Sequence, residues 1–403
     1  MIDNRKDVVI IANFVDNFDY KGNSRFAYLA DLLSETCNVE LITSDFCHVT
    51  KSEKTKPSAL NYKLTFLHEC GYKKNVCLKR FKSHKQFGKN VKKYLKNRET
   101  PDCIYCAVPS LECAKYAAKY ARKSKVKFII DVQDLWPEAF KMVLNIPVLS
   151  NLIFAPMART ANYIYSSADE IIGVSQTYCD RALKVNKKVA DAHAVFLGVD
   201  LDTFDSNAAN NKPTACHDKF VIGYCGTLGH SYDIKCVIDA MALCKGNTEM
   251  PIELRIFGDG PLSDEFKRYA KELNVDAVFY GRLSYEKMCG EISECDVAVN
   301  PIVRGAAQSI INKHADYAAA GIPIINTQEA MEYRNLIDDY RCGINCECGN
   351  QKEVANAINI LLTDKAMCIE MGRNARRMAI DKFDREKTYN EIVNSIVGED
   401  NND

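Results

Sequence analysis

The sequence predicts an α/β protein built from two Rossmann-like domains, and three observations support this class. The chain has 403 residues, which is more than one hydrophobic core usually supports. Short apolar runs alternate with stretches of helical periodicity, the pattern of a parallel sheet covered by helices. This pattern stops near residue 200 and restarts at residue 220. Because ligands bind at the carboxyl ends of such strands, we expect the two domains to face each other across a ligand-binding cleft.

The first array begins with the apolar run VVIIAN at 8–13, which is typical of a strand buried on both faces. A loop over 14–23, a helix over 24–34 and a strand over 39–43 complete a right-handed βαβ unit. Gly22 stands near the end of this loop, where a phosphate or sugar could approach the backbone, although a lone glycine is more often part of a turn. Further elements are predicted as strands over 102–107, 127–132 and 170–175 and helices over 111–124 and 151–167.

The second array follows a segment at 195–204 that we interpret as a hinge. Residues 205–219 are rich in Asn, Ala and Lys and poor in apolar side chains, as expected of an exposed connection. The elements predicted after it are strands over 220–226, 252–257, 278–281, 296–300 and 322–326 and helices over 233–244, 285–294, 353–363, 364–380 and 385–397.

These patterns predict an N-terminal domain over 1–200 and a C-terminal domain over 201–380. We expect a C-terminal helix over 381–397 to pack back on the N-terminal domain. The polar residues 398–403 are expected to be a disordered tail.

Composition and charge exclude several classes of protein. Lys plus Arg and Asp plus Glu both number 53, so no global charge attracts nucleic acid or a membrane. No apolar run approaches the roughly 20 residues that span a bilayer, and we expect no signal peptide because the first residues lead directly into a strand. Eighteen Cys residues fit buried thiols of a reducing cytoplasm better than disulfides. Cys342, Cys346 and Cys348 leave a structural zinc site open, but their spacing matches none of the usual zinc motifs.

Residues 72–98 hold eleven Lys or Arg and no Asp or Glu. Apolar residues at helical spacing, such as Phe87, Val91 and Leu95, predict a basic amphipathic helix in this stretch. Such a helix can bind an anionic membrane, with about 1 kcal/mol per basic residue near the surface, and we favour this interpretation for residues 73–98. The alternative is a solvated helix with an ordinary core face. Nucleic acid is the less favoured partner, because the chain shows no platform of interleaved aromatic and basic residues.

The most informative stretch is 299–325, VNPIVRGAAQSIINKHADYAAAGIPII. A strand end leads through small residues into a short helix, whose first N–H groups suit a phosphate. Arg304 and Lys313 flank this loop with positive charge, and Asp316 could accept hydrogen bonds from sugar hydroxyls. On this stretch alone, an ordinary loop and helix is an equally good interpretation.

Four segments resemble family 4 glycosyltransferases of the GT-B fold: GTLG at 226–229, FGDGP at 257–261, YGRL at 280–283 and NKHADYAAAGIPII at 312–325. The last is the most specific, because it is similar to the family's run Asn/Ser-Lys-x-x-Glu/Asp-Tyr-x-Ala-x-Gly-x-Pro-Ile. The resemblance covers nearly the whole chain. DLWPE at 134–138 is similar to a sub-group that builds bacterial surface polysaccharides, such as capsule, O-antigen and exopolysaccharide, on lipid-linked precursors.

The resemblance implies that the second domain binds a nucleotide-diphosphate sugar. Main-chain groups at Arg282 and Leu283 would contact the base, and Asp316 would bind the ribose hydroxyls. The diphosphate would lie against Lys313 or Arg304 and the backbone amides of Gln308, Ser309 and Ile310. The remaining residues that the resemblance places at the donor are Gly226, Thr227, Gly258 and Gly260. The first domain would bind the acceptor, with Gly22 near the phosphates and Asp134 near the sugar.

This sequence departs from the family pattern at three of these positions. Gln308 stands where many members carry the first Glu of an E-x7-E pair, whose second acid corresponds to Asp316. Thr227 and Tyr232 stand where many members carry an Arg and a Lys that bind phosphate. The positive charge on the diphosphate would therefore come mainly from Arg304 and Lys313.

The expected chemistry requires no metal and no other cofactor. A sugar diphosphate already has a good leaving group, so positive charge and N–H donors suffice, without the two opposed carboxylates of a glycosidase. No Asp-x-Asp metal motif stands in a plausible loop. The family retains the anomeric configuration, and on the acceptor side Asp131 and Asp134 are the candidate catalytic residues, of which we favour Asp134. Closure about the hinge at 195–204 would exclude water.

The predicted protein is thus a retaining hexosyltransferase, cytoplasmic and peripheral on the inner face of the plasma membrane, with a lipid-linked saccharide as acceptor. Two alternatives stay open. A UDP-sugar 2-epimerase of the same fold needs acids and a His at the anomeric carbon, whereas the seven His mostly lie outside the motif loops. A non-catalytic partner subunit would bind sugar nucleotide or lipid and support another transferase.

Overall fold

The structure is a computed structural model that describes residues 5–398, apart from residues 17, 19–23, 58, 75–76, 144–146, 214–217, 247–249 and 307–308. The chain divides into two compact units. The first comprises Met1–Phe196 together with Lys387–Asp403, and the second comprises Leu197–Glu386. The chain therefore passes from one unit to the other twice, first at 196/197 and again at 386/387.

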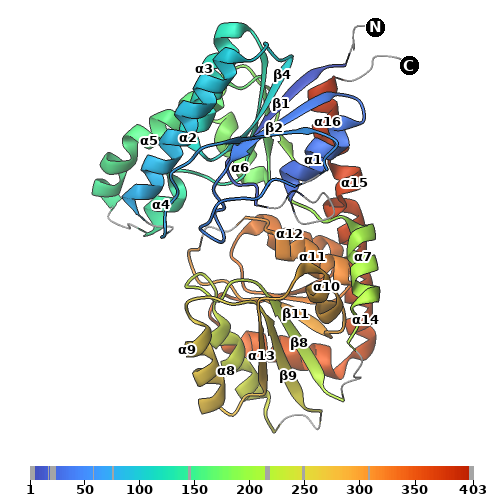
Figure 1. The fold of residues 1–403 in the computed structure, drawn as a ribbon. Coiled ribbons are helices and arrows are strands. Elements are labelled where there is room, and N and C mark those ends of the chain that lie inside the picture. The colour runs from blue at the N-terminus through green and yellow to red at the C-terminus, as the bar shows by residue number, and fades with distance from the viewer. Residues whose placement is uncertain are drawn as a thin grey trace. The chain divides into compact units, whose positions relative to one another are not determined.

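The first unit is built on a seven-stranded parallel sheet in the order β3-β2-β1-β4-β5-β6-β7 (Figure 1). Its central strands are rich in Val, Ile and Cys and are buried almost throughout, as expected of a parallel sheet covered on both faces, whereas the outer strands β3 and β7 are only partly buried. Their bounds are β1 (Asp7–Ile11), β2 (Asn38–Ser44), β3 (Lys63–Leu67), β4 (Cys103–Val108), β5 (Lys127–Val132), β6 (Glu170–Gly173) and β7 (His193–Ala194).

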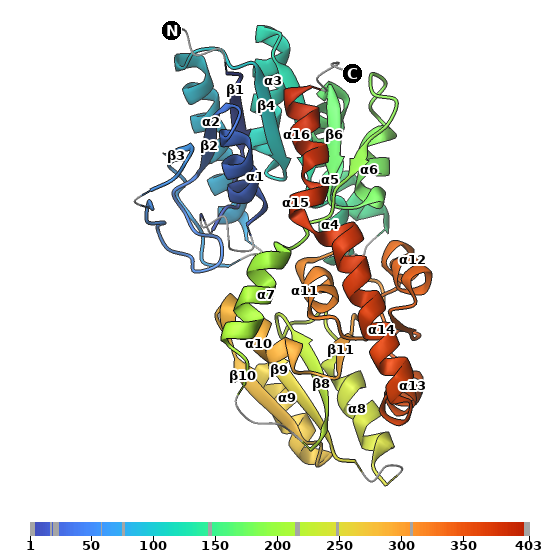
Figure 2. The same ribbon diagram turned by 90° about the vertical axis from the view of Figure 1, so that its right-hand side faces the viewer.

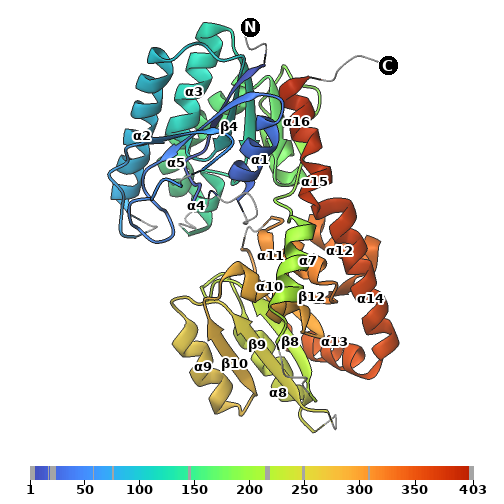
Figure 3. The ribbon, with the colours of Figure 1, turned by 45° about the vertical axis from the view of Figure 1, so that its right-hand side comes forward.

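Helices cover both faces of this sheet. The helices α2 (Leu78–Asn97), α3 (Leu111–Ser124) and α5 (Pro147–Ser167) lie on one face, and α1 (Arg25–Ser34) and α16 (Asn390–Val397) lie on the other (Figures 1 and 3). Ile392 and Ile396 of α16 are buried in the same core as β1 and α1, so the end of the chain completes the first unit. The shorter helices of this unit are α4 (Glu138–Val143) and α6 (Gln176–Leu183).

The second unit is built on a six-stranded parallel sheet in the order β10-β9-β8-β11-β12-β13. Its strands are β8 (Phe220–Cys225), β9 (Ile252–Phe257), β10 (Ala277–Gly281), β11 (Val297–Asn300), β12 (Ile324–Asn326) and β13 (Gly343–Asn345). The strand order reverses between β8 and β11, and ligands of such sheets bind at the carboxyl ends of the strands at this point.

The core helices of this unit are α8 (Ile234–Cys244), α9 (Ser263–Glu272) and α13 (Gln351–Thr363), which pack on one face of the sheet (Figures 1 and 2). The other helices are α7 (Leu201–Asn210), α10 (Tyr285–Ser293), α11 (Asn312–Ala320), α12 (Met331–Tyr340) and α14 (Lys365–Met378), with a π-helical turn at Ala379–Phe383 and the start of α15 (Arg385–Thr388). The expected α/β class with two Rossmann-like parallel sheets is confirmed.

The structure corrects the prediction for the connection at 205–219. Helix α7 begins at Leu201 and runs to Asn210, through residues that are too polar to signal a helix. It forms because Asp200 caps it, with Oδ1 accepting a hydrogen bond from the Thr203 amide at 2.7 Å. Leu201 and Phe204 anchor its first turn in the core.

The cysteines behave as buried apolar side chains. All those described are free thiols, and most are buried. Cys348 Sγ lies 3.0 Å from the carbonyl oxygen of Ile302, and Cys342 Sγ lies 3.8 Å from Met378 Sδ. Across the described ranges, no three His, Cys, Asp or Glu side chains are grouped to hold a metal ion. None of the helices in these ranges has both the length and the hydropathy that crossing a bilayer requires.

Candidate functional site

The candidate site of the second unit lies at the carboxyl ends of β8 and β11, where the strand order reverses. The loops that follow these two strands are joined by backbone hydrogen bonds, from Asp233 to the Pro301 carbonyl at 3.0 Å and from Val303 to the Ser231 carbonyl at 3.1 Å. The stretch at 299–325 therefore lies beside the GTLG segment. Two predicted site residues, Gly22 in the first unit and Gln308 in the second, lie outside the described residues.

The predicted glycines bring two loops into close contact. The Gly226 amide donates to the Phe257 carbonyl at 3.0 Å. A Cβ atom at Gly258 would lie 1.8 Å from the Gly226 carbonyl oxygen, and one at Gly260 would lie 2.3 Å from that of Leu228. Gly258 and Gly260 are thus required for backbone packing, whatever else they contact. Gly226 itself has a φ of +137°, which strongly favours glycine.

Lys313 is the most unusual residue of this site. Its side chain is buried, and its Nζ lies 4.4 Å from the ring centre of Tyr224 and 4.0 Å from that of Tyr232. Within the described part of the chain, this ammonium group has no hydrogen-bond partner. Burial lowers the pKa of Lys313 to about 7, against a small opposing effect of Cys225. Two aromatic faces stabilise the cation. Its N–H donors have no partner among the described residues and are therefore available to a ligand.

The surroundings of Lys313 are suited to an anion. A Cβ atom at Gly226 would lie 3.4 Å from Lys313 Nζ, so the missing side chain opens space beside the ammonium group. Lys313 is the second residue of α11 and so lies at a helix N-terminus, which favours anions, although the His314 amide there already donates to the Ile311 carbonyl at 3.0 Å. Just before this helix, Ser309 Oγ is buried and also without a partner among the described residues, and Ile310 is buried. Unused donors of this kind favour a phosphate group.

Asp316 follows Lys313 by one turn of α11 and lies on the same side of the helix. Its Oδ1 accepts a hydrogen bond from the Tyr285 hydroxyl at 3.0 Å. Burial raises the pKa of Asp316 to about 6, although Tyr285 and Arg385 act in the opposite direction. Tyr285 was not predicted as a site residue, because it belongs to α10 and nothing in its local sequence indicates this contact.

The other predicted residues lie at the surface. Arg304 carries an exposed guanidinium that donates to Glu347 Oε1 at 3.1 Å and lies 3.9 Å from Glu329. Arg282 is exposed and Leu283 half-buried, in the loop that follows β10. Thr227 follows Gly226, and its carbonyl accepts a hydrogen bond from the Tyr224 hydroxyl at 2.9 Å.

In the first unit, the two candidate acids have different surroundings. Asp131 is fully buried and pairs with Arg25, whose Nε lies 2.7 Å from Asp131 Oδ2. The same oxygen accepts a hydrogen bond from the Tyr105 hydroxyl at 2.7 Å. Asp131 therefore binds two buried side chains of its own unit, which indicates a structural role. Asp134 accepts hydrogen bonds from its own loop, at 2.8 Å from the Leu135 amide and 3.0 Å from Trp136 Nε1. Burial raises the pKa of Asp134 despite these bonds.

The fold defines the chain as an α/β protein of two Rossmann-like units. Residues 205–378 match the family described as "Glycosyl transferases group 1". A search among curated protein sequences found no match.

Similar solved structures cover nearly the whole chain at low sequence identity. HepE from Anabaena, in complex with UDP-glucose, has a TM-score of 0.67 and 14% identity, over 97% of this chain and 99% of its own. Sucrose-phosphate synthase from Thermosynechococcus elongatus has a TM-score of 0.70 and 17% identity, over 97% and 98%. WaaG, a glycosyltransferase involved in lipopolysaccharide biosynthesis, has a TM-score of 0.67 and 14% identity, over 97% and 100%. Residues 205–378 of the second unit thus match the group 1 glycosyl transferases, and the chain has the GT-B fold.

Proposed function

We propose that the chain transfers a hexose-type sugar, with retention of configuration, from a nucleotide-diphosphate sugar to a lipid-linked saccharide acceptor in surface-polysaccharide biosynthesis. The observation that carries the proposal is the buried Lys313 ammonium group, which has no hydrogen-bond partner in the described ranges. The family match supports sugar transfer. Two of the similar structures, HepE with UDP-glucose and WaaG of lipopolysaccharide biosynthesis, support a UDP-sugar donor and a polysaccharide pathway.

In this proposal, Lys313 and the start of α11 bind the diphosphate of the donor. Burying an amine without a partner costs free energy, and a diphosphate that reaches Nζ recovers it through charge-assisted hydrogen bonds. As the bond to the sugar breaks, negative charge grows on the departing phosphate. Lys313, held in place before the reaction, stabilises this charge most strongly in the transition state.

Arg304 is the second cation proposed for the diphosphate. Its ion pairs with Glu329 and Glu347 lie at the surface, where the Arg304 side chain is 65% exposed. Such pairs contribute roughly 0–1 kcal/mol, so a diphosphate with two negative charges can displace them. Asp316 would bind ribose hydroxyls, and the Arg282-Leu283 backbone would contact the base.

On the acceptor side, Asp134 is the proposed catalytic carboxylate. Hydrogen bonds from Leu135 and Trp136 fix its orientation, and a raised pKa makes it a stronger proton acceptor for a sugar hydroxyl. We propose that the reaction uses no metal, since the departing diphosphate can be stabilised by Lys313 and Arg304.

The proposed location is the cytoplasmic face of the plasma membrane, where the basic helix α2 would bind anionic lipid. Replacing four of its lysines by glutamate, at Lys89, Lys92, Lys93 and Lys96, should release the protein from anionic vesicles. Sedimentation with vesicles of phosphatidylglycerol measures this, and unchanged sedimentation would remove the membrane part of the proposal.

The function itself is tested by incubating the protein with labelled UDP- and GDP-sugars and a membrane lipid extract. Transfer of label into the lipid fraction supports the proposal. Free epimerised sugar would instead support the epimerase, and donor binding without turnover would support a non-catalytic subunit. The Lys313→Ala variant should lose transfer while keeping its fold, and near-normal turnover in that variant would contradict the phosphate role.

A further inference from the structure

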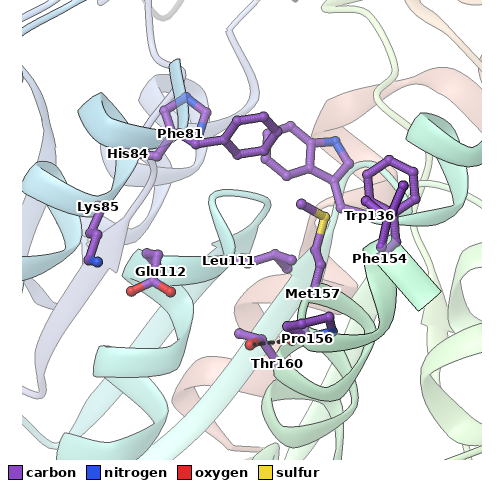
Figure 4. A pocket seen from close by; sticks show the side chains of 11 residues that line it. Phe81, His84, Lys85, Leu111, Glu112, Trp136, Phe154, Pro156, Met157 and Thr160 are labelled. Atoms are coloured by element: carbon purple, nitrogen blue, oxygen red, sulfur yellow. Dashed lines mark hydrogen bonds between the residues drawn. The ribbon is translucent and has the colours of Figure 1, made fainter. Parts of the chain in front are cut away.

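A separate cavity lies within the first unit, among α2, α3 and α5. Its volume is about 410 Å³, within the usual range of roughly 300–1,000 Å³ for ligand pockets. Most of its wall is apolar and is made by Phe81, Leu111, Trp136, Ile153, Phe154 and Met157. Figure 4 shows Trp136, Phe154 and Met157 gathered on one side, with Lys85 and Glu112 on the other. The steps proposed for sugar transfer place no ligand in this cavity, although Trp136 of its wall also donates a hydrogen bond to Asp134.

The wall of this cavity is a rigid aromatic assembly. Trp136 and Phe140 lie with ring centres 4.8 Å apart, and Phe140 lies 5.6 Å from Phe81 and 6.1 Å from Phe154. His84 stacks on Trp136, with ring centres 5.7 Å apart and an interplanar angle of 13°.

Exposed apolar side chains surround this cavity. Leu78 is 87% exposed and Leu152 is 74% exposed, and Phe81 and Ile153 of the cavity wall are themselves 37% and 52% exposed. The described residues of the first unit expose five large apolar side chains, which are these four and Val49. The four come only from the first turn of α2 and from α5. Large apolar side chains concentrated at one place mark a surface that contacts another apolar phase.

Positive charge lies directly beside this apolar surface. Nine lysines of the stretch 73–96 are all exposed, and among the described residues none of them has a carboxylate within ion-pair distance. Those on α2 recur every three or four residues on the side opposite Phe87 and Val91, which are buried. The set comprises Lys73, Lys74, Lys79, Lys82, Lys85, Lys89, Lys92, Lys93 and Lys96.

We propose that the cavity binds one hydrocarbon chain of an anionic membrane lipid, while the lysines of α2 contact the anionic surface. An apolar cavity with an apolar rim favours a hydrocarbon chain. The adjoining exposed lysines favour a lipid whose headgroup is negatively charged. Each buried methylene contributes about 0.8 kcal/mol, so capture of one chain strengthens binding to the membrane. Salt weakens the electrostatic attraction of the lysines but not this apolar contribution. This inference concerns membrane anchoring and does not depend on the donor chemistry of the second unit.

The only tryptophan of the chain makes the test direct, because Trp136 forms part of the cavity wall and is just 4% exposed. The protein is mixed with phosphatidylglycerol vesicles whose acyl chains carry bromine at mid-chain, and with matched unbrominated vesicles. Bromine quenches tryptophan on contact. We expect fluorescence to fall by at least half with the brominated lipid and to stay nearly constant with the other.

Two variants separate chain capture from surface binding. Ile153→Lys places a charge at the exposed rim and should lose most of the quenching while still sedimenting with the vesicles. Val49→Lys, at another exposed apolar residue of the first unit, adds the same charge away from the cavity and should quench like the parent protein. The proposal would be overturned if the parent protein sediments with the vesicles but is not quenched, or if it does not bind them at all. It would also be overturned if Ile153→Lys is quenched as strongly as the parent protein.

Discussion

The pKa of Lys313 leads to a quantitative prediction for donor binding. In the free protein burial lowers this pKa to about 7, so Lys313 is mostly charged at pH 6 and mostly neutral at pH 8.5. A bound diphosphate favours the charged form and raises the pKa, so binding takes up a proton above pH 7. If the pKa in the complex is well above 9, the titration of Lys313 should by itself raise the dissociation constant about 30-fold between pH 6 and 8.5, equivalent to about 2 kcal/mol. A sugar diphosphate keeps its own charge constant over this range.

Titration calorimetry measures this effect directly. The dissociation constant of a nucleotide sugar is determined at several pH values, in two buffers of different ionisation enthalpy. The parent protein should take up about half a proton per donor at pH 7 and nearly one at pH 8. The Lys313→Met variant should bind weakly and show neither proton uptake nor pH dependence between pH 7.5 and 8.5, where Asp316, with its pKa of about 6, is already ionised. A constant affinity in the parent protein, or the same slope in the variant, would refute this account of the site.

Three further predictions concern stability and the second residue of the site. Lys313→Met should raise the free energy of urea unfolding by about 1–3 kcal/mol at pH 6, because it removes a buried polar group without a partner among the described residues. This difference between variant and parent should shrink from pH 7 to 10, because over that range the unfolded Lys313 side chain binds more protons than the folded one. Tyr285→Phe removes the hydrogen bond to Asp316 and should weaken donor binding by roughly 5–10-fold, equivalent to about 1 kcal/mol; unchanged calorimetric affinity would place the ribose elsewhere. Arg25→Met leaves Asp131 buried without its cation and should cost about 3–5 kcal/mol in urea unfolding, and a loss below 1 kcal/mol would contradict a structural role.

Much of the fold could be predicted from the sequence because its signals are local. Most strands of the two sheets are continuous apolar runs, and such runs indicate a buried strand in any parallel sheet that helices cover. Helix α7 was missed because its stability comes from an Asp200 cap and two buried side chains instead of periodic apolar residues. Strand β3, at the edge of its sheet and only partly buried, was missed for a similar reason.

The site could be predicted only in part. Lys313 and Asp316 were identified because they fall in one short motif, although their pKa values are shifted by burial in the folded unit, which the motif does not show. Tyr232 shows this most clearly. The sequence indicated only that a family cation was missing there, whereas the structure shows that its ring contacts the Lys313 ammonium. The ion pairs of Arg304 could not be predicted either, because its partners Glu329 and Glu347 follow it by 25 and 43 residues in the sequence.

The most direct test of the central claim, that the second unit binds the diphosphate of a sugar donor through Lys313, is a thermal-shift panel of nucleotide sugars near pH 6.5. At 100-fold its dissociation constant, a cognate donor should add roughly 2.7 kcal/mol to the stability of the parent protein. Lys352→Ala, which removes an exposed lysine of α13, should keep this gain, and Lys313→Ala should lose most of it. A panel without any stabilising nucleotide sugar, or equal stabilisation of both variants, would contradict the account.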